Sequence, residues 1–192
     1  MRKLVVTNIV SLDGFSEGPG GNVLALPMDP AFDRSNVEHL RHADTLLTGA
    51  NTFRGFQEFW PGAQDMAEMS EDNREISRLN NAIAKVVVSD SMTDDDLTAW
   101  KETTTLVRRA DAHAMVRALK EQEGGDILVF GSRILWNDLL AAGLVDEIHL
   151  IVGATVLGEG TPAFLHTPDL ELLAARPLQG SSNALMSYRV RT

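Results

Sequence analysis

The chain contains no cysteine among its 192 residues, which excludes a disulfide framework, a thiolate metal site and a cysteine nucleophile. Basic residues are also few: 17 Lys and Arg stand against 27 Asp and Glu, a formal net charge of −10. Binding to nucleic acid requires clustered lysine and arginine, so this charge argues against a nucleic-acid partner. An anionic ligand must instead be held by a local group of arginines and backbone amides.

A long apolar run is missing too. No stretch of ~18 apolar residues is present to span a bilayer, and the amino terminus enters an alternating strand pattern rather than a signal peptide. We therefore expect a cytoplasmic protein with no membrane partner. The five histidines form no H-E-x-x-H pair, so no metal site is predicted. The length and the 44% hydrophobic content suit one α/β domain over residues 1–192.

Strand-like runs alternate with helical patterns along the chain, an order typical of a mainly parallel sheet flanked by helices. Strands are expected at residues 3–11, 45–48, 84–89, 104–107, 127–130, 147–156 and 185–190, and helices at 30–42, 66–81, 111–122 and directly after Gly131. A further helix that opens at Asn51 or Thr52 is expected to break at Trp60-Pro61-Gly62, because proline lacks a backbone N–H. The last two strands are expected to pair as an antiparallel edge.

Two glycines stand where a strand leads directly into a helix. Gly131 ends an apolar strand and is followed at once by a helix, and Gly49 separates a strand from the helix that opens at Asn51 or Thr52. The first N–H groups of a helix are unpaired, and their partial positive charge suits a pyrophosphate. The two turns predict a nucleotide cofactor. A plain turn, and for Thr52 a plain helix cap, are the alternative interpretations.

Five separate stretches follow one another in order along the chain: Ser11-Leu12-Asp13-Gly14, Gly49-Ala50-Asn51-Thr52-Phe53, Phe130-Gly131-Ser132, Gly143-Leu144-Val145-Asp146-Glu147 and Val156-Leu157-Gly158-Glu159-Gly160. Together they resemble the dihydrofolate-reductase-like family, and most closely the reductase domain of the bifunctional riboflavin-biosynthesis deaminase-reductase. The H-x-E and P-C-x-x-C pattern of a deaminase half is absent. The resemblance implies a three-layer α/β/α fold whose central, mostly parallel sheet has an antiparallel carboxyl-terminal edge.

The resemblance also implies NADPH, laid across the carboxyl ends of the strands. The residues then expected to bind the cofactor are Gly49, Asn51, Thr52, Phe53, Ser89, Arg108, Gly131, Ser132, Arg133 and Ile134. Glycine at 49 and 131 would let the backbone approach the cofactor without a side-chain collision. Ala50 stands where related NADPH enzymes often have a basic residue; Ser89 with Arg108 or Arg109 could compensate, or the arginine pair could simply be solvated.

By the same resemblance, Asp13 lies in a loop over the nicotinamide. It is expected to be catalytic, as a proton donor or an electrostatic partner for the nascent amine or alcohol, or alternatively a turn residue that bonds its own loop. The residues expected to bind the substrate are Asn8, Asp29, Phe56, Trp60 and Gly160. The resemblance also places Asp29 and Asp33 near the position where folate reductases have the carboxylate that binds the pteridine; both could instead be the cap and a first-turn charge of their helix.

These features predict an NADPH-dependent reductase of a small heterocyclic or carbonyl compound. A 5-amino-6-(5-phosphoribosylamino)uracil reductase of riboflavin biosynthesis is one candidate, although Thr7 stands where such enzymes commonly have lysine. The alternatives are a non-catalytic nucleotide-binding or sensor protein on the same fold, and a reductase that uses a deazaflavin. A homodimer is also expected, with residues 148–157 as either an interface strand or a core strand.

Overall fold

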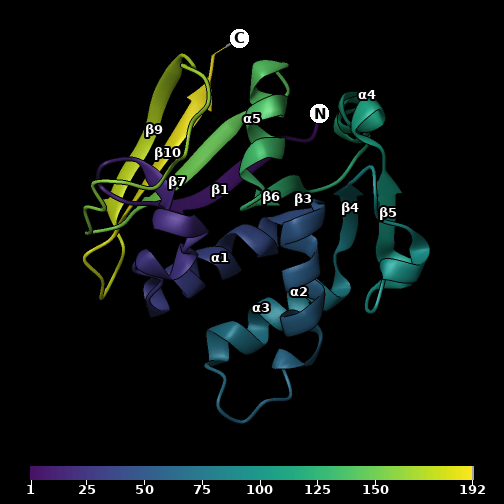
Figure 1. Ribbon diagram of the computed structural model, residues 1–192, viewed down its shortest axis with the longest axis horizontal. Helices are drawn as coiled ribbons and strands as arrows, with labels where there is room; N and C mark the ends of the chain where they lie inside the picture. The colour runs from purple at the N-terminus through teal and green to yellow at the C-terminus, as the bar shows by residue number, and fades with distance from the viewer. Residues whose placement is uncertain (192) are drawn as a thin grey trace.

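In residues 1–191, which this computed structural model describes, an eight-stranded sheet forms the middle layer (Figure 1). Its strands are β1 Leu4–Val10, β3 Ala43–Gly49, β4 Ala84–Val88, β5 Thr104–Val107, β6 Asp126–Phe130, β7 Glu147–Val152, β9 Leu170–Pro177 and β10 Ala184–Val190. Their order across the sheet is β5-β4-β3-β6-β1-β7-β10-β9. The pairs from β5 to β7 are parallel, and β10 is antiparallel to both of its neighbours. The expected antiparallel edge is confirmed.

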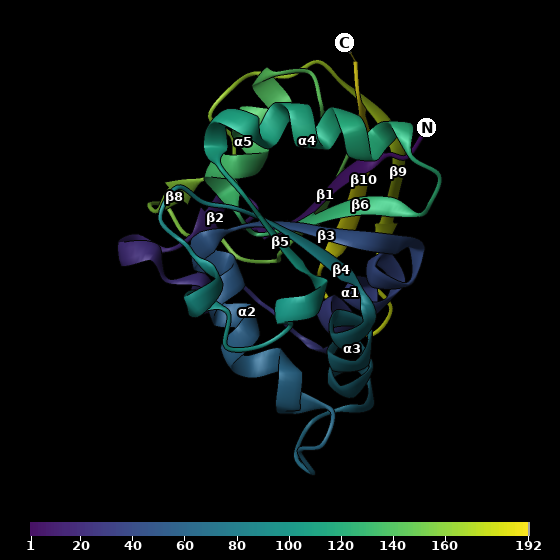
Figure 2. The same cartoon turned by 90° about the vertical axis from the view of Figure 1, so that its right-hand side faces the viewer.

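Helices cover both faces of the sheet (Figure 2). α1 Pro30–His42, α2 Ala50–Ala63 and α3 Glu71–Ala82 lie on one face, and α4 Arg109–Glu121 and α5 Arg133–Ala141 lie on the other. Short 3₁₀ helices lie at Pro19–Gly21, Val23–Ala25, Asp94–Asp96 and Lys101–Thr103. Within the part of the chain that the structure describes, none of the helices combines the length and the apolar character needed to cross a membrane.

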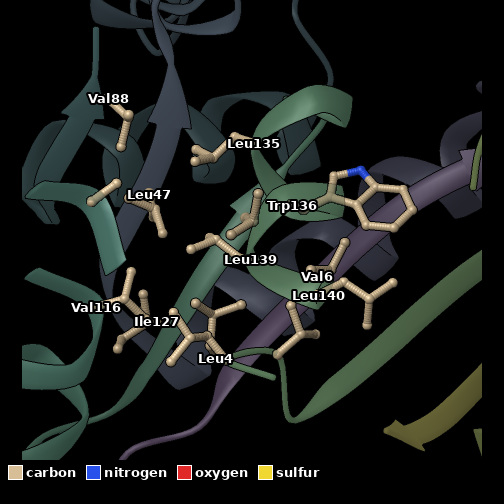
Figure 3. Packing of buried hydrophobic residues seen from close by; sticks show 14 of the residues in the cluster. Leu4, Val6, Leu47, Val88, Val116, Ile127, Leu135, Trp136, Leu139 and Leu140 are labelled. Atoms are coloured by element: carbon tan, nitrogen blue, oxygen red, sulfur yellow. The ribbon is translucent and has the colours of Figure 1, made fainter. Parts of the chain in front are cut away.

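Strand β1 contributes to the core on both of its faces, because successive side chains of a strand point in opposite directions. Val6 packs in the same cluster as Trp136 of α5, whereas Val5 packs with Val37 of α1. Figure 3 shows the α5 side of this core, where the indole of Trp136 is fully buried. Burying a large apolar side chain contributes about 1.5–3 kcal/mol. This packing holds α5 against the sheet and so positions its first turn at the end of β6.

Two of the expected helix boundaries are wrong. α2 continues through Pro61 to Ala63 instead of breaking at Trp60-Pro61-Gly62. Pro61 lies in the last turn, so the helix loses one hydrogen bond close to where its pairing ends in any case. α3 begins at Glu71 rather than at residue 66, because the Ser70 hydroxyl accepts the Asn73 N–H at 3.1 Å and caps the helix there.

The carboxyl-terminal strands also differ from expectation. β7 ends at Val152 rather than at residue 156, and it lies between β1 and β10 with Ile148 and Ile151 fully buried. The run 148–157 therefore contributes a core strand and not an exposed interface strand. The homodimer stays a prediction, and this strand does not support it. The outer strand β9 was missed because most of its residues are exposed. A second, two-stranded sheet pairs β2 Phe15–Glu17 with β8 Thr161–Pro162, which directly follows Gly160.

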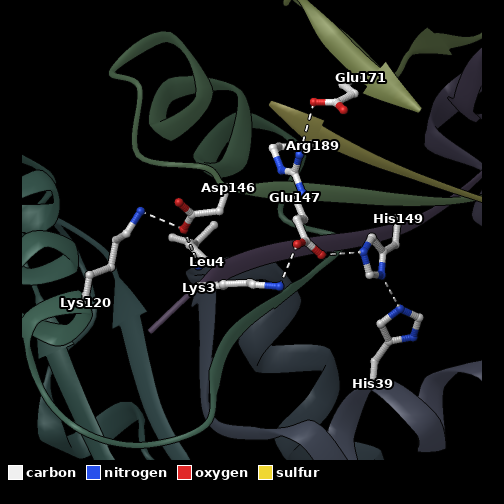
Figure 4. Close-up of polar contacts among 9 residues, drawn as sticks. All are labelled: Lys3, Leu4, His39, Lys120, Asp146, Glu147, His149, Glu171 and Arg189. Carbon is white, nitrogen blue, oxygen red and sulfur yellow. Dashed lines mark hydrogen bonds and ion pairs between the residues drawn. The ribbon is translucent and has the colours of Figure 1, made fainter. Parts of the chain in front are cut away.

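A chain of polar contacts runs along the starts of β1 and β7 to the α1 layer (Figure 4). Lys3 Nζ lies 2.7 Å from Glu147 Oε1, and Glu147 Oε2 lies 3.1 Å from His149 Nε2. His149 Nδ1 lies 2.8 Å from Nε2 of His39 on α1. The contacts link α1 to the sheet at the strand ends opposite to Gly49 and Gly131.

Candidate functional site

Two strand-to-helix turns meet at the carboxyl ends of β3 and β6. The Gly49 N–H donates to Ser132 Oγ at 3.0 Å, and the Ser132 N–H donates to Thr52 Oγ1 at 3.2 Å. Gly131 and Ser132 both have positive φ, at 53° and 48°, a conformation that costs a residue with a side chain roughly 1–2 kcal/mol. The structure thus brings together four residues expected to bind the cofactor: Gly49, Thr52, Gly131 and Ser132.

Both helices that begin at this junction lack a side-chain cap in the described part of the chain. Gly49, at the start of α2, has no side chain, and the Ser132 hydroxyl accepts from Gly49 rather than from its own helix α5. By contrast, Asp29 caps α1 and Ser70 caps α3. Uncapped N–H groups and the positive end of the helix dipole favour an anion. The junction therefore presents two adjacent helix N-termini suited to a negatively charged group.

The neighbouring first-turn residues differ in what they can contact. Asn51 and Ile134 are exposed beside the junction, Ile134 to 63%. The Arg133 guanidinium donates to the Pro162 carbonyl and so ties the start of α5 to strand β8. These three residues lie where they were expected, around the two turns.

Phe53 is a correction. Its side chain is fully buried and packs with Val87, Met92 and Trp100. A side chain without exposed surface cannot contact a cofactor, so the expected role of Phe53 is wrong and the residue belongs to the core. In the sequence Phe53 follows the same glycine turn as Asn51 and Thr52, which is why it looks like a site residue. Its side chain packs against Trp100, which lies far along the chain, so the local sequence does not show its burial.

The two residues expected at the adenosine end lie at the neighbouring strands. Ser89 follows β4, and its hydroxyl accepts the N–H groups of Ser91 at 3.2 Å and Met92 at 3.0 Å. Arg108 follows β5, is exposed, and donates to the backbone carbonyl of Asp90. Ser89 therefore holds its own loop, whereas Arg108 borders the edge where the strands end.

Asp13 joins two loops at the carboxyl end of β1. Hydrogen bonds from the Ser11 hydroxyl at 2.7 Å and from the backbone N–H groups of Gly158 at 2.7 Å and Leu157 at 3.1 Å reach its carboxylate. They lower the pKa of Asp13 from 3.8 to about 2. A carboxylate that is ionised at neutral pH has no proton to donate, so Asp13 does not fit the expected proton donor. Its contacts fit the alternative role of a turn residue.

Asp29 and Gly160 have structural partners of their own. Asp29 Oδ1 accepts the N–H groups of Ala31 and Phe32, both at 3.0 Å, and Oδ2 accepts the Ser181 hydroxyl. Its carboxylate is thus used as a helix cap. Gly160 has a φ of 147°, and a Cβ there would lie 2.2 Å from the Glu17 carbonyl oxygen. Close packing of the small sheet accounts for this glycine.

The remaining substrate residues lie on opposite faces of the sheet. Phe56 and Trp60 of α2 pack, partly buried, against the core on the α1 face. Asn8 alternates with Thr7 along β1 and shares the α5 face with Val6. Thr7 points to the α1 face, where it is 1% exposed and its hydroxyl has no partner among the described residues. The structure therefore does not bring Asn8 together with Phe56 and Trp60.

Asp33 is a candidate that the sequence left as a first-turn charge. It is half-buried on α1, and desolvation raises the pKa of its carboxyl, although the Asn73 amide donates to it at 3.2 Å. Its hydrogen-bond partner Asn73 lies on α3, 40 residues away along the chain. The sequence around residue 33 therefore does not predict that Asn73 lies beside it.

Comparison with known proteins agrees with this architecture. The family model of the RibD C-terminal domain matches residues 2–180. The uncharacterized protein YyaP of Bacillus subtilis (strain 168) is 30% identical over 164 residues, which cover 85% of this chain and 81% of that protein.

Solved structures with low sequence identity share the fold. Dihydrofolate reductase from Enterococcus faecalis, complexed with NADP(H), superposes with a TM-score of 0.61 at 14% identity, covering 99% of this chain and 97% of that one. A diaminohydroxyphosphoribosylaminopyrimidine deaminase/5-amino-6-(5-phosphoribosylamino)uracil reductase from Thermotoga maritima gives a TM-score of 0.67 at 12% identity; the match covers 99% of this chain and 57% of that chain. With the family model spanning nearly its whole length, this chain belongs to the RibD C-terminal domain family of reductase-like proteins.

Proposed function

We propose that the protein is an NADPH-dependent reductase of a small heterocyclic or carbonyl substrate. The observation that carries the proposal is the junction of Gly49 and Ser132, where α2 and α5 begin side by side without side-chain caps. A pyrophosphate is an anion of the size and charge that two such helix starts suit. The dinucleotide would then lie across the carboxyl ends of the strands, as ligands do in open α/β sheets.

The glycine at position 49 supports this placement. Its φ is −85°, a value open to any residue, and a Cβ there would meet only Ser132 Oγ, at 4.0 Å. The protein's own packing therefore gives no reason for glycine at this position. Close approach of a ligand to the backbone supplies such a reason, because a side chain would stand between them.

In the proposed reaction the bound nicotinamide supplies a hydride to an electrophilic carbon of the substrate. The protein has to hold the two reactants in contact, exclude water and provide one proton to the substrate nitrogen or oxygen. As the group that delivers this proton we propose Asp33, a half-buried carboxyl in the first turn of α1 whose pKa is raised by desolvation, in preference to Asp13, whose carboxylate is already held by Ser11 and Gly158. Asp13 instead positions the loop at the end of β1.

Thr7 bears on the substrate. Its buried, neutral side chain occupies the β1 position where related riboflavin reductases commonly have lysine. At 1% exposure the hydroxyl does not itself reach a ligand, but without the lysine this position offers no positive charge to an anionic substrate group, which weakens the case for a phosphorylated ribosylaminopyrimidine. The reductase of Thermotoga maritima named above remains the relative whose substrate should be tried alongside.

A titration with NADPH and NADH, followed by nicotinamide fluorescence, tests the proposal. The test variant is Gly131→Asp, which places a negative charge at the start of α5; a Cβ at this position makes ordinary contact with Thr52, at 3.5 Å, and the φ of 53° adds backbone strain. We expect NADPH binding that this variant abolishes while its circular dichroism stays unchanged. Binding followed by oxidation of NADPH with pyrimidine, pterin or carbonyl compounds would establish the reductase. Absence of binding to both nucleotides would refute it and favour a deazaflavin or another ligand.

A further inference from the structure

Asp90 makes an unusual set of contacts between the ends of β4 and β5. Its Oδ1 accepts the N–H of Arg109, the first residue of α4, at 3.0 Å, and its Oδ2 lies 3.4 Å from Arg109 Nε. Its backbone carbonyl accepts the guanidinium of Arg108. One acidic residue thus contacts both arginines of the only adjacent Arg-Arg pair in the sequence and caps the helix that follows them.

The start of α4 lies on the side where one end of a dinucleotide would reach. Strands in a sheet are about 4.8 Å apart, and β5 is two strands from β3, so the start of α4 is displaced by roughly 10 Å from the junction of Gly49 and Ser132. The nicotinamide end has to extend in the other direction, toward β1 and Asp33, if hydride transfer takes place there. The adenosine end and any 2′-phosphate therefore extend toward β4, β5 and Arg108.

We propose that Asp90 is a specificity-determining residue that limits the preference for a 2′-phosphorylated dinucleotide over its unphosphorylated counterpart. The inference rests on the proposed dinucleotide function. A 2′-phosphate needs a cationic partner and is repelled by a carboxylate. Asp90 places a carboxylate at the helix start where the phosphate would be favoured, and it pairs with Arg109, one of the two cations available to it.

The size of the effect follows from the exposure of the group. The Asp90 side chain is 57% exposed and that of Arg109 is 76% exposed, so their interactions with a ligand are screened by water and salt. For a doubly charged phosphate about 5 Å from the carboxylate, Coulomb's law in water with screening at 0.1 M salt gives a penalty of roughly five- to tenfold in affinity. Asp90 should accordingly reduce the wild type's preference for NADPH over NADH by this factor.

Three forms of the intact chain test the inference: the wild type, Asp90→Asn and Asp111→Asn. Asparagine at 90 removes the charge but keeps an oxygen that can cap α4. Asp111 lies in the first turn of the same helix and is exposed, so its variant adds the same unit of charge nearby without touching Arg109. Dissociation constants for NADPH and NADH are measured by nicotinamide fluorescence at 50 and 500 mM salt.

We expect Asp90→Asn to tighten NADPH binding by about five- to tenfold at low salt, to leave NADH binding unchanged, and to lose most of this gain at high salt. Asp111→Asn should change the ratio of the two constants by less than about twofold. An unchanged ratio in Asp90→Asn, or an equal change in Asp111→Asn, would overturn the inference while leaving the reductase proposal intact. If no form binds either dinucleotide, the proposed function and this inference fail together.

Discussion

His39 makes the stability of the fold depend on pH in a direction that can be worked out. It lies on α1, with Nδ1 2.6 Å from the Ser35 carbonyl oxygen and Nε2 2.8 Å from His149 Nδ1 (Figure 4). Burial, followed by the effect of the neighbouring His149, lowers the pKa of His39 from 6.5 to about 4, although the Ser35 carbonyl acts in the opposite sense. The ring is therefore neutral in the folded protein at pH 7.

The folded pKa of His39 is depressed, so the unfolded chain takes up the proton first as the pH falls. The contribution of His39 to the free energy of unfolding is fully present above about pH 6.5 and is lost progressively as the pH falls toward 4. Each pKa unit corresponds to about 1.4 kcal/mol. The difference between 6.5 and about 4 thus amounts to on the order of 3 kcal/mol, a large part of the stability of an ordinary domain.

Urea unfolding of the wild type, His39→Gln and His42→Gln between pH 7.5 and 4.5 measures this term. Glutamine at 39 retains an amide that can donate to the Ser35 carbonyl but does not titrate. His42 lies on the same helix and is exposed, so its variant controls for the loss of a histidine. As the pH falls over this range, the free energy of unfolding should decrease in all three proteins. We expect the decrease in His39→Gln to be smaller than in the other two by about 2–3 kcal/mol. Equal pH dependence in all three would refute the assignment.

Two further predictions concern the site and the small sheet. Asp33→Asn should lower kcat by about 100-fold and remove the alkaline limb of the pH–rate profile, while the affinity for NADPH stays unchanged. Asp72→Asn is the control. Equal losses of kcat in both variants would argue against Asp33 as the proton donor. Gly160→Ala should destabilise the protein by on the order of 1–3 kcal/mol, since the new Cβ meets the Glu17 carbonyl. Gly158→Ala meets nothing within 4 Å, so urea unfolding should show a smaller loss.

Most of the parallel half of the sheet could be predicted from the sequence because strands such as β1, β4 and β6 are largely buried on both faces. β1 and β6 are nearly continuous apolar runs with a glycine or a turn after them, and that signal is local. β9 has no such signal, since six of its eight residues are exposed and the strand is recognisable only beside β10. β2 and β8, with three and two residues, are too short for a periodic pattern.

The same distinction applies to the candidate site. Gly49 and Gly131 were identifiable because a strand, a glycine and a helix follow one another directly in the sequence. Asp13 and Asp29 look equally suited to binding or catalysis from their local context, but their hydrogen-bond partners include Gly158, 145 residues away, and Ser181, 152 residues away. The availability of a carboxylate depends on such distant partners, and no pattern around the residue contains them.

Among residues 1–191, the three helices that directly follow a parallel strand, α2, α4 and α5, differ in how their first turns are satisfied. α2 and α5 begin uncapped at Gly49 and Ser132, whereas a carboxylate from Asp90 fills the start of α4. An unpaired helix start is a cost to the free protein that a bound anion removes, so leaving two of them open side by side favours a ligand at that point. Filling the third with the chain's own anion reduces the need for a phosphate there. On the proposed function, we therefore expect the affinity for the dinucleotide to come from its pyrophosphate more than from its adenosine end.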